Sequence, residues 1–505
     1  MAGQSEHTRK GENLLQTPEQ EHGTPSHRQF SPVHSRKLGV TRRQRDRRDL
    51  KEDENPEAKA RRHKEMELKP LYKELLYTIS HKMGKPGSAE VFTDSQLHQY
   101  IQEAFTMTDA EHGSLMEIVH NTEPPVYCLM VTVKEAKEII GKDISGFSDP
   151  YCLLMVLEEE EEKKSSRSKA KPSKYVVKGT VSHEKIYQTD IKKQTLNPIW
   201  NQTFILEFEN LTRTSFHLEM WDKDEEVSLT QKLEDIKTNL TSLRRMIKEA
   251  KKEKGTDDFL GNIVLKLQDL HCTEDHWYNL EPRTETYPNR GQCHLFLKFI
   301  HKARDGTLSA GRSAYTNYCG ILQQFVQAYI SKQQSSAPWK GALCGEAQTL
   351  LELYATQNDL SPFLQDLAKW VAYSKLYQTL EVDSSVLFQQ LTSIEYHWHQ
   401  QELPYQQKQE LGDSLHGFLQ YGLCLVSKYR DIFPPTPSAT PKLHTLLRIL
   451  VQICKTQAFQ KLNPAHFELH EGVFDAIQTG TEEWFTIKKG LHQPMTKVTS
   501  YNFTK

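Results

Sequence analysis

Residues 141–154, GKDISGFSDPYCLL, place two carboxylates, Asp143 and Asp149, six residues apart on a short turn that leads into an apolar run. Asp, Ser and Gly are common turn residues, because their side chains bond nearby backbone groups and glycine accepts positive φ. This stretch alone is therefore equally compatible with an ordinary turn between two strands and with a cation site. Further carboxylates elsewhere in the chain decide between the two.

The sequence on both sides of this turn has the period of a β-sandwich. In VYCLMVTV, residues 126–133, aliphatic side chains recur at every second position, which is typical of a strand with one buried face. Similar runs are YCLLMVL (151–157), SKYVVKGTV (173–181), TFILEF (203–208), SFHLEMW (215–221), FLGNIVLKL (259–267) and QCHLFLKFI (292–300). Seven or eight strands in about 175 residues predict an antiparallel β-sandwich over residues 123–305.

The remainder of the 505 residues divides into helical and charged segments. Residues 1–65 lack aliphatic periodicity and include the basic run RKLGVTRRQRDRR (36–48), so we expect a disordered basic tail. Helical spacing predicts a short helical collar over residues 66–122, a helical insertion over residues 227–254 with one apolar stripe, and an all-α region over residues 306–505.

Composition and charge exclude several classes of function. The net charge of −2 gives no attraction to nucleic acid, so we expect no nucleic-acid partner. Eight scattered cysteines without CxxC pairs are typical of reduced thiols in a cytosolic protein. We find no signal peptide and no run near ~18 apolar residues, so membrane contact is expected to be peripheral.

No catalytic signature appears, and we expect the protein not to be an enzyme. GxSxG, HExxH, GxxxxGK[ST] and GxGxxG after a strand are all missing from the sequence. His397 and His399 lie two residues apart, which points them to different sides of a helix, so we interpret them as surface residues and not as a metal site.

Three more carboxylates stand at strand ends far from the opening turn. HLEMWDKDEE (217–226) contains Asp222 and Asp224, and GTDDFLG (255–261) contains Asp258. Clustered carboxylates repel one another and raise one another's pKa unless a cation neutralises them. Ca²⁺ accepts six to eight oxygens in flexible geometry, whereas Mg²⁺ prefers few carboxylates and retained water. The set therefore predicts a calcium site.

Four segments resemble the successive signatures of a calcium-binding C2 domain: DISGFSDPYC, KKQTLNPIWNQTFILEF, MWDKD and DDFLG. The resemblance implies that the five aspartates Asp143, Asp149, Asp222, Asp224 and Asp258 bind Ca²⁺, with the backbone carbonyl of Lys223 as an additional ligand. It also implies that Ile144 and Phe147 are apolar tips presented to a bilayer, although Phe147 could equally belong to the core.

Basic residues before TLNP are a second candidate membrane contact. They are Lys174, Lys178, Lys185, Lys192 and Lys193. In C2 domains a comparable strand binds anionic head groups, and each cation contributes ~1 kcal/mol near such a surface. The alternative is a solvated edge strand, since lysines also prevent sheet-to-sheet aggregation.

The helical insertion resembles that of the Munc-thirteen family. Five sequence segments also resemble this family: SGFSDPYCLL, QTLNPIW, LEPRTETYP, TSIEYHWHQ and QTGTEEWF. The resemblance implies a calcium-dependent phospholipid-binding tether and priming factor for exocytosis of secretory granules or lysosomes. Implied partners are anionic phospholipid membranes, SNARE proteins such as syntaxin, and a Rab GTPase. The implied location is cytoplasmic and peripheral to secretory granules, late or recycling endosomes and lysosomes.

Two alternatives to the regulated tether stay open. One is a calcium-independent protein-interaction scaffold in vesicle trafficking, and the other is a C2-bearing lipid enzyme. The helical MUN region of the family continues further and precedes a second C2 domain, so residues 306–505 are expected to hold only its start. A candidate Rab-binding surface at the exit of the sandwich comprises Lys298, His301, Lys302 and Arg304, with a solvated basic linker as the alternative.

Overall fold

The computed structural model describes residues 56–87, 90–141, 146–158, 186–223, 259–282, 289–333, 337–400, 404–462 and 467–491. Several predicted features lie outside these residues: the strand at 173–181, the helical insertion at 227–254, and the site residues Asp143, Ile144, Lys174, Lys178, Lys185, Asp224 and Asp258.

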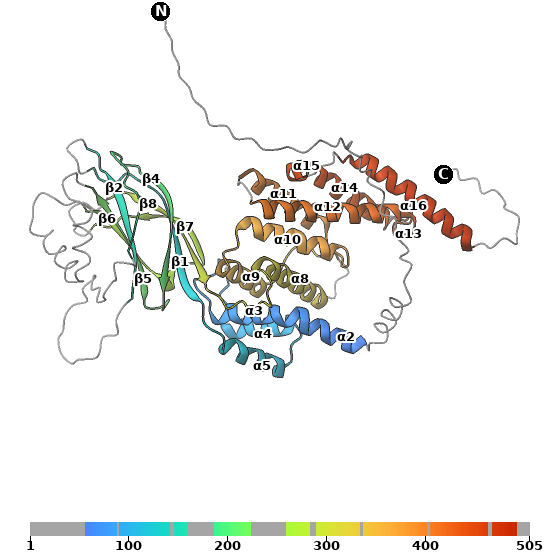
Figure 1. The fold of residues 1–505 in the computed structure, drawn as a ribbon, viewed down its shortest axis with the longest axis horizontal. Helices are drawn as coiled ribbons and strands as arrows, with labels where there is room; N and C mark the ends of the chain where they lie inside the picture. The colour runs from blue at the N-terminus through green and yellow to red at the C-terminus, as the bar shows by residue number, and fades with distance from the viewer. Residues whose placement is uncertain are drawn as a thin grey trace, which may run out of the picture. The chain divides into compact units, whose positions relative to one another are not determined.

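A β-sandwich of two four-stranded sheets follows the first helices, as the fold class predicted from the sequence requires (Figure 1). Sheet one has the order β4 (Ile199–Phe208), β1 (Val126–Lys137), β8 (Gln292–Lys302) and β7 (Thr273–Asn279). Sheet two has the order β3 (Tyr187–Gln188), β2 (Pro150–Glu158), β5 (Thr214–Asp222) and β6 (Phe259–Lys266), with a 3-10 turn at Leu267–Asp269. All neighbouring strands pair antiparallel.

The interior of the sandwich is built from the alternating aliphatic side chains of its strands. Leu129, Val131 and Val133 of β1 are fully buried, and Leu297 of β8 and Leu218 of β5 belong to the same apolar core. A register shift between Val133 and Glu135 marks a bulge in β1. The period-two pattern of residues 126–133 therefore reflects the burial of one face of β1, as the sequence predicted.

Helices stand on both sides of the sandwich in the sequence. Those before it are α2 (Pro56–His63), the π-helical turn η1 (Lys64–Leu68), α3 (Lys69–Ser80), α4 (Asp94–Ala104) and α5 (Asp109–His120). Those after it are α8 (Ala314–Lys332), α9 (Gly345–Gln357), α10 (Pro362–Tyr377), α11 (Ser384–Gln400), α12 (Tyr405–Ser427), α13 (Tyr429–Ile432), α14 (Thr440–Lys455), α15 (Gln457–Leu462) and α16 (Leu469–Leu491). Residues 56–65 are helical, which corrects the expectation of a disordered tail up to residue 65.

Local signals fix where α4 and α5 begin. Thr93 accepts the N–H of Gln96 while the Gln96 side chain accepts the N–H of Thr93, and Thr108 and Glu111 form the same reciprocal pair. Such capping boxes satisfy backbone groups that the first helical turn leaves without intrahelical partners.

The predicted collar and the C-terminal helices form one helical body. Leu75 of α3 and Ile101 of α4 share a single apolar core with Ile321 of α8 and Leu350 of α9. Helix α3 approaches α8 so closely that a Cβ on Gly320 would lie 2.7 Å from a Leu71 methyl group. The collar is thus the N-terminal part of the helical body, and the sandwich separates its two parts in the sequence.

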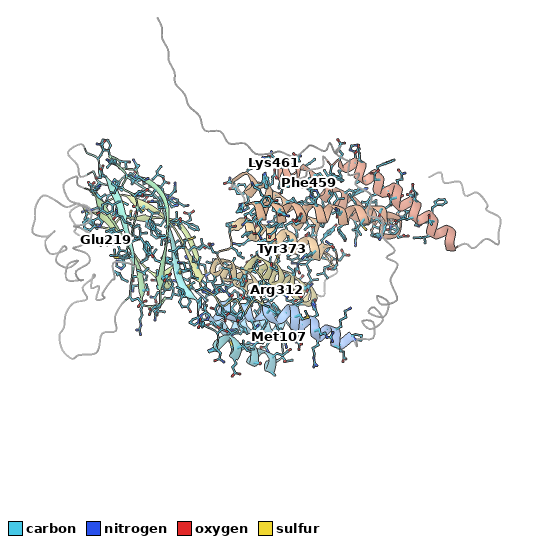
Figure 2. All side chains as sticks on the ribbon, in the orientation of Figure 1. Met107, Glu219, Arg312, Tyr373, Phe459 and Lys461 are labelled. Atoms are coloured by element: carbon cyan, nitrogen blue, oxygen red, sulfur yellow. The ribbon has the colours of Figure 1, made fainter. Side chains whose placement is uncertain are left out.

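Large side chains fill this helical body along its length. Met107, Tyr373 and Phe459 come from distant parts of the sequence and are all buried among the helices (Figure 2). In the part of the chain that the structure describes, no helix combines the length and apolarity needed to cross a membrane.

Candidate calcium-binding site

Two of the predicted aspartates meet at one end of sheet two. Pro150 at the start of β2 pairs with Asp222 at the end of β5, which brings Asp149 next to Asp222. The Asp149 N–H donates to Asp222 Oδ1 over 2.6 Å, and the Lys223 N–H donates to the Asp149 carbonyl oxygen over 3.1 Å. The strand register therefore fixes both carboxylates and the Lys223 backbone at one place.

The surrounding turn holds Asp149 in a defined orientation. The Gln194 N–H donates to Asp149 Oδ1 over 2.7 Å, and the Thr195 N–H donates to the Ser148 carbonyl over 2.9 Å. The buried Ser148 hydroxyl donates to the Ile140 carbonyl over 3.0 Å. Sequence reasoning missed Gln194, which has the unusual positive φ of 50° and so aims its N–H at the carboxylate.

The electrostatics of this pair suit a cation. Asp222 is only 2% exposed, and neither Asp149 nor Asp222 forms an ion pair with a basic side chain among the residues described. Backbone N–H groups occupy one oxygen of each carboxylate. Burying a carboxylate without a compensating cation is costly, so the donor set fits a hard cation such as Ca²⁺, which prefers oxygen ligands.

Candidate membrane-contacting residues flank the pair. Gly146 has φ +79°, and the Phe147 side chain that follows it is 46% exposed, so Phe147 is not a core residue. Lys192 and Lys193 lie in the connection from β3 to β4, beyond the two-residue strand β3. The Lys192 N–H donates to the Pro150 carbonyl over 3.0 Å, which anchors this basic connection beside the carboxylate pair.

Most of the four residues predicted to form an exposed Rab-binding surface are instead used inside the molecule. Lys298 is 8% exposed and pairs with Asp359 over 2.7 Å, and His301 is 9% exposed and contacts the His81 carbonyl over 3.0 Å. These two residues pack β8 against the helical body, so they do not form an exposed surface.

Arg304 is also used inside the molecule. Its guanidinium pairs with Glu74 over 2.7 Å, donates to Asn358 Oδ1 over 2.8 Å and lies 4.8 Å from the centre of the Tyr77 ring. Burial raises the pKa of Glu74, while Arg304 opposes that rise. Of the four predicted residues only Lys302 is exposed, and it pairs with Glu207 over 3.4 Å. The prediction of a four-residue surface is therefore wrong for Lys298, His301 and Arg304.

The predicted surface role of His397 needs a correction of the same kind. His397 Nε2 lies 2.9 Å from Asp366 Oδ2 in a largely buried contact between α11 and α10, whereas His399 contacts Glu395 on its own helix. The two histidines point to different partners, as their spacing predicted.

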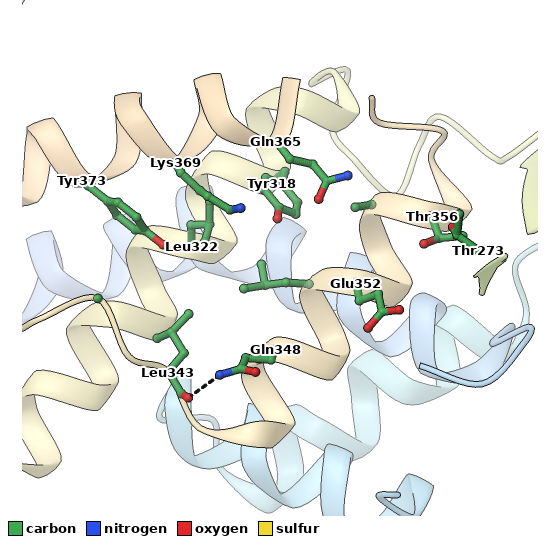
Figure 3. Close-up of a pocket in the computed structure, with 13 residues that line it drawn as sticks. Thr273, Tyr318, Leu322, Leu343, Gln348, Glu352, Thr356, Gln365, Lys369 and Tyr373 are labelled. Atoms are coloured by element: carbon green, nitrogen blue, oxygen red, sulfur yellow. Dashed lines mark hydrogen bonds between the residues drawn. The ribbon is translucent and has the colours of Figure 1, made fainter. Parts of the chain in front are cut away.

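A pocket of about 400 Å³ lies among α8, α9 and α10 (Figure 3). Tyr318, Glu352, Lys369 and Tyr373 line it, and Gln348 Nε2 donates to the Leu343 carbonyl at its edge over 2.8 Å. Lys369 and Glu352 have opposite charges, so the lining favours neither anions nor cations as ligands. The end of the sandwich that carries Asp149 and Asp222 is therefore the better-defined candidate site.

The fold and the carboxylate-bearing strand ends define a C2 domain, and the C2 domain family matches residues 127–173 and 167–280. Among solved structures, the plant Extended Synaptotagmin 1 C2A domain is 19% identical, with a TM-score of 0.22, covering 35% of this chain and 96% of that one.

Relatives extend the similarity beyond the sandwich. The chain is 49% identical over 427 residues to Protein unc-13 homolog D of Homo sapiens, covering 84% of this chain and 39% of that protein. It is 32% identical over 443 residues to BAI1-associated protein 3 of Homo sapiens, covering 83% and 37%. The chain is therefore a close homologue of unc-13 homolog D, and it spans about two fifths of the length of these curated relatives.

Proposed function

We propose that the chain is a calcium-dependent phospholipid-binding tether and priming factor for exocytosis of secretory granules or lysosomes. The observation that carries this proposal is the carboxylate pair Asp149 and Asp222, fixed at one end of the sandwich beside an exposed Phe147. Asp143, Asp224 and Asp258 would complete the site, with the Lys223 carbonyl as a further ligand.

Calcium would act through charge. Without it, the carboxylates at this end repel an anionic bilayer. Bound Ca²⁺ would neutralise them and leave Phe147, Ile144 and the basic connection to engage the membrane. The residues of this chain supply the oxygen ligands, hold them in place through backbone hydrogen bonds and present the apolar tip.

Homology to unc-13 proteins supports a place in vesicle exocytosis. Within it we propose SNARE proteins such as syntaxin and a Rab GTPase as partners, and cytoplasmic, peripheral association with secretory granules, late or recycling endosomes and lysosomes. Lys298, His301 and Arg304 contact other parts of this chain, so of the four residues of the candidate Rab-binding surface we propose only Lys302 for contact with a Rab GTPase.

The second candidate function is a calcium-independent scaffold. The helical body favours it, because helices from before and after the sandwich share one large apolar core. Sedimentation of the full chain with anionic liposomes, with and without calcium, separates the two functions. Binding that requires calcium supports the tether, and equal or no binding in both conditions supports the scaffold.

Lys192→Ala with Lys193→Ala should weaken calcium-stimulated liposome binding about tenfold or more, because each cation near an anionic surface contributes ~1 kcal/mol. The remaining binding should be less sensitive to salt, since the screened attraction is reduced. Liposome sedimentation at low and physiological ionic strength measures both effects.

Lys134 provides a matched control, because it lies on β1 and is held by Asp275 over 2.7 Å. Lys134→Ala should leave liposome binding unchanged. An equal loss in the control would mean that overall charge, and not the connection beside the carboxylates, sets the affinity.

A further inference from the structure

A β-bulge interrupts sheet two close to the candidate calcium site. Met220 of β5 lies opposite Gly261 of β6, and the next residue of β5, Trp221, lies opposite Phe259. Leu260 is therefore an extra residue of β6 that has no opposite residue in β5. Such an extra residue disrupts the ladder of backbone hydrogen bonds and increases the local twist, and bulges next to functional sites often re-aim a side chain.

The bulge determines how β5 reaches Asp222. This aspartate directly follows Trp221, pairs with Pro150 of β2 and accepts the Asp149 N–H over 2.6 Å. A ladder without the extra residue would place Leu260 opposite Trp221, and a shift by one residue exchanges the two faces of a strand. The bulge must therefore be kept for β5 to end beside Asp149 as it does.

The Arg290 side chain bonds to the bulge itself. Its Nη1 donates to the Phe259 carbonyl over 3.1 Å and to the Leu260 carbonyl over 3.3 Å, the two consecutive carbonyls at the interruption. A guanidinium stays charged at every physiological pH, and a charged donor makes stronger hydrogen bonds than a neutral one. Arg290 therefore fastens the bulge from a turn that lies about thirty residues further along the chain.

The turn that carries Arg290 is held in place by its neighbours. Gly291 has φ +86°, which favours glycine, and a Cβ on it would lie 2.4 Å from the Lys137 carbonyl oxygen and 2.6 Å from that of Glu138. The Leu280 N–H donates to the Gly291 carbonyl over 3.0 Å. The turn thus packs against the end of β1 and the chain that follows β7, which keeps Arg290 beside β6.

We propose that Arg290 is a positioning residue of the calcium site: by holding the bulge between β5 and β6, it keeps Asp222 where it can bind Ca²⁺ together with Asp149. This inference rests on the proposed function and extends it. Arg290 is not itself a ligand, since a guanidinium has no acceptor atom to offer a cation. It acts through the carbonyl groups of β6 and the pairing of β6 with β5.

Arg290→Met tests the positioning in the calcium-free chain. Methionine is a long, flexible side chain that donates no hydrogen bond, so the bulge should open more often. Hydrogen–deuterium exchange should become about tenfold faster at the amides of Asp149 and Lys223, which donate to Asp222 Oδ1 and to the Asp149 carbonyl. Mass spectrometry of peptides that cover these two amides measures the rates.

Calorimetric titration with calcium gives the second measurement. Arg290→Met should weaken calcium binding about tenfold, the lower end of the range for outer partners that orient metal ligands. Arg290→Lys keeps the charge and a flexible donor, so its exchange rates and calcium affinity should lie between those of the unmodified chain and Arg290→Met. If Arg290→Met does not fold, Arg290→Lys carries both measurements, and unchanged values in it would overturn the proposal.

Leu206→Ala is the control for a merely structural role. Leu206 lies in the core of the sandwich and pairs with Leu129, near the start of β1 and far along the strand from Lys137. This variant should lower Tm and leave both the calcium affinity and the exchange of the two amides unchanged.

The outcomes separate this inference from the proposed function. Arg290 variants that lower Tm alone, as Leu206→Ala does, would overturn the positioning role and leave the proposed function standing. An unmodified chain that takes up no calcium would overturn the proposed function, and the calcium role of Arg290 with it.

Discussion

Asp149→Asn with Asp222→Asn is expected to abolish calcium-stimulated binding of the full chain to anionic liposomes. Each asparagine keeps an oxygen that can accept the N–H groups of Asp149 and Gln194, so the turn should retain its geometry. What is lost is the negative charge that a hard cation requires from its ligands. Stability without calcium should change little or rise, because repulsion among clustered carboxylates is relieved.

Asp190→Asn is the matched control for this variant. Asp190 is an exposed carboxylate on the β3–β4 connection of the same sandwich, and its backbone carbonyl accepts the Trp200 indole N–H. The control should bind liposomes as the unmodified chain does. A double variant at Asp149 and Asp222 that still responds to calcium would show that these residues are not the ligands.

Arg304→Glu should lower the free energy of unfolding by about 3–5 kcal/mol, the range for breaking a buried ion pair by removing one partner. The Arg304 and Glu74 side chains are 15% and 5% exposed, and their pair joins the end of the sandwich to α3. Charge reversal leaves two carboxylates where one salt bridge stood. Urea unfolding followed by circular dichroism measures the change.

Lys302→Glu two residues earlier is the control, because Lys302 is 43% exposed and its pair with Glu207 spans 3.4 Å. Exposed pairs contribute about 0–1 kcal/mol, so this variant should stay within that range. Equal destabilisation by both reversals would contradict the assignment of Arg304 to the junction between sandwich and helices.

The parts of the fold that sequence predicted well are those with a strong local pattern. The aliphatic alternation in β1 and the helical spacing in α3 both record burial on one side of an element. Strand β7 was missed, because Asp275, His276 and the other polar residues of TEDHWYN conceal the alternation of an edge strand. The sequence also did not predict that the helices before and after the sandwich form one helical body, since the sandwich separates α3 from α8 in the chain.

In the candidate site, too, the residues with a local sequence signal were predicted and those without one were not. Asp149 and Asp222 were identified because each stands in a short motif at a strand end, and the strand register then brings them together. Arg304 looked like a surface cation, since its partner Glu74 is 230 residues away and leaves no local signal. Gln194 acts through its backbone N–H, which no side-chain pattern reveals.

Calorimetric titration of calcium into the full chain shows directly whether the sandwich binds calcium. We expect saturable calcium uptake at or below about millimolar, the weak end of protein calcium sites. Asp149→Asn with Asp222→Asn should remove this uptake, and Asp190→Asn should preserve it. Absence of any calcium uptake by the unmodified chain up to about millimolar would contradict the calcium-regulated tether and leave the calcium-independent scaffold.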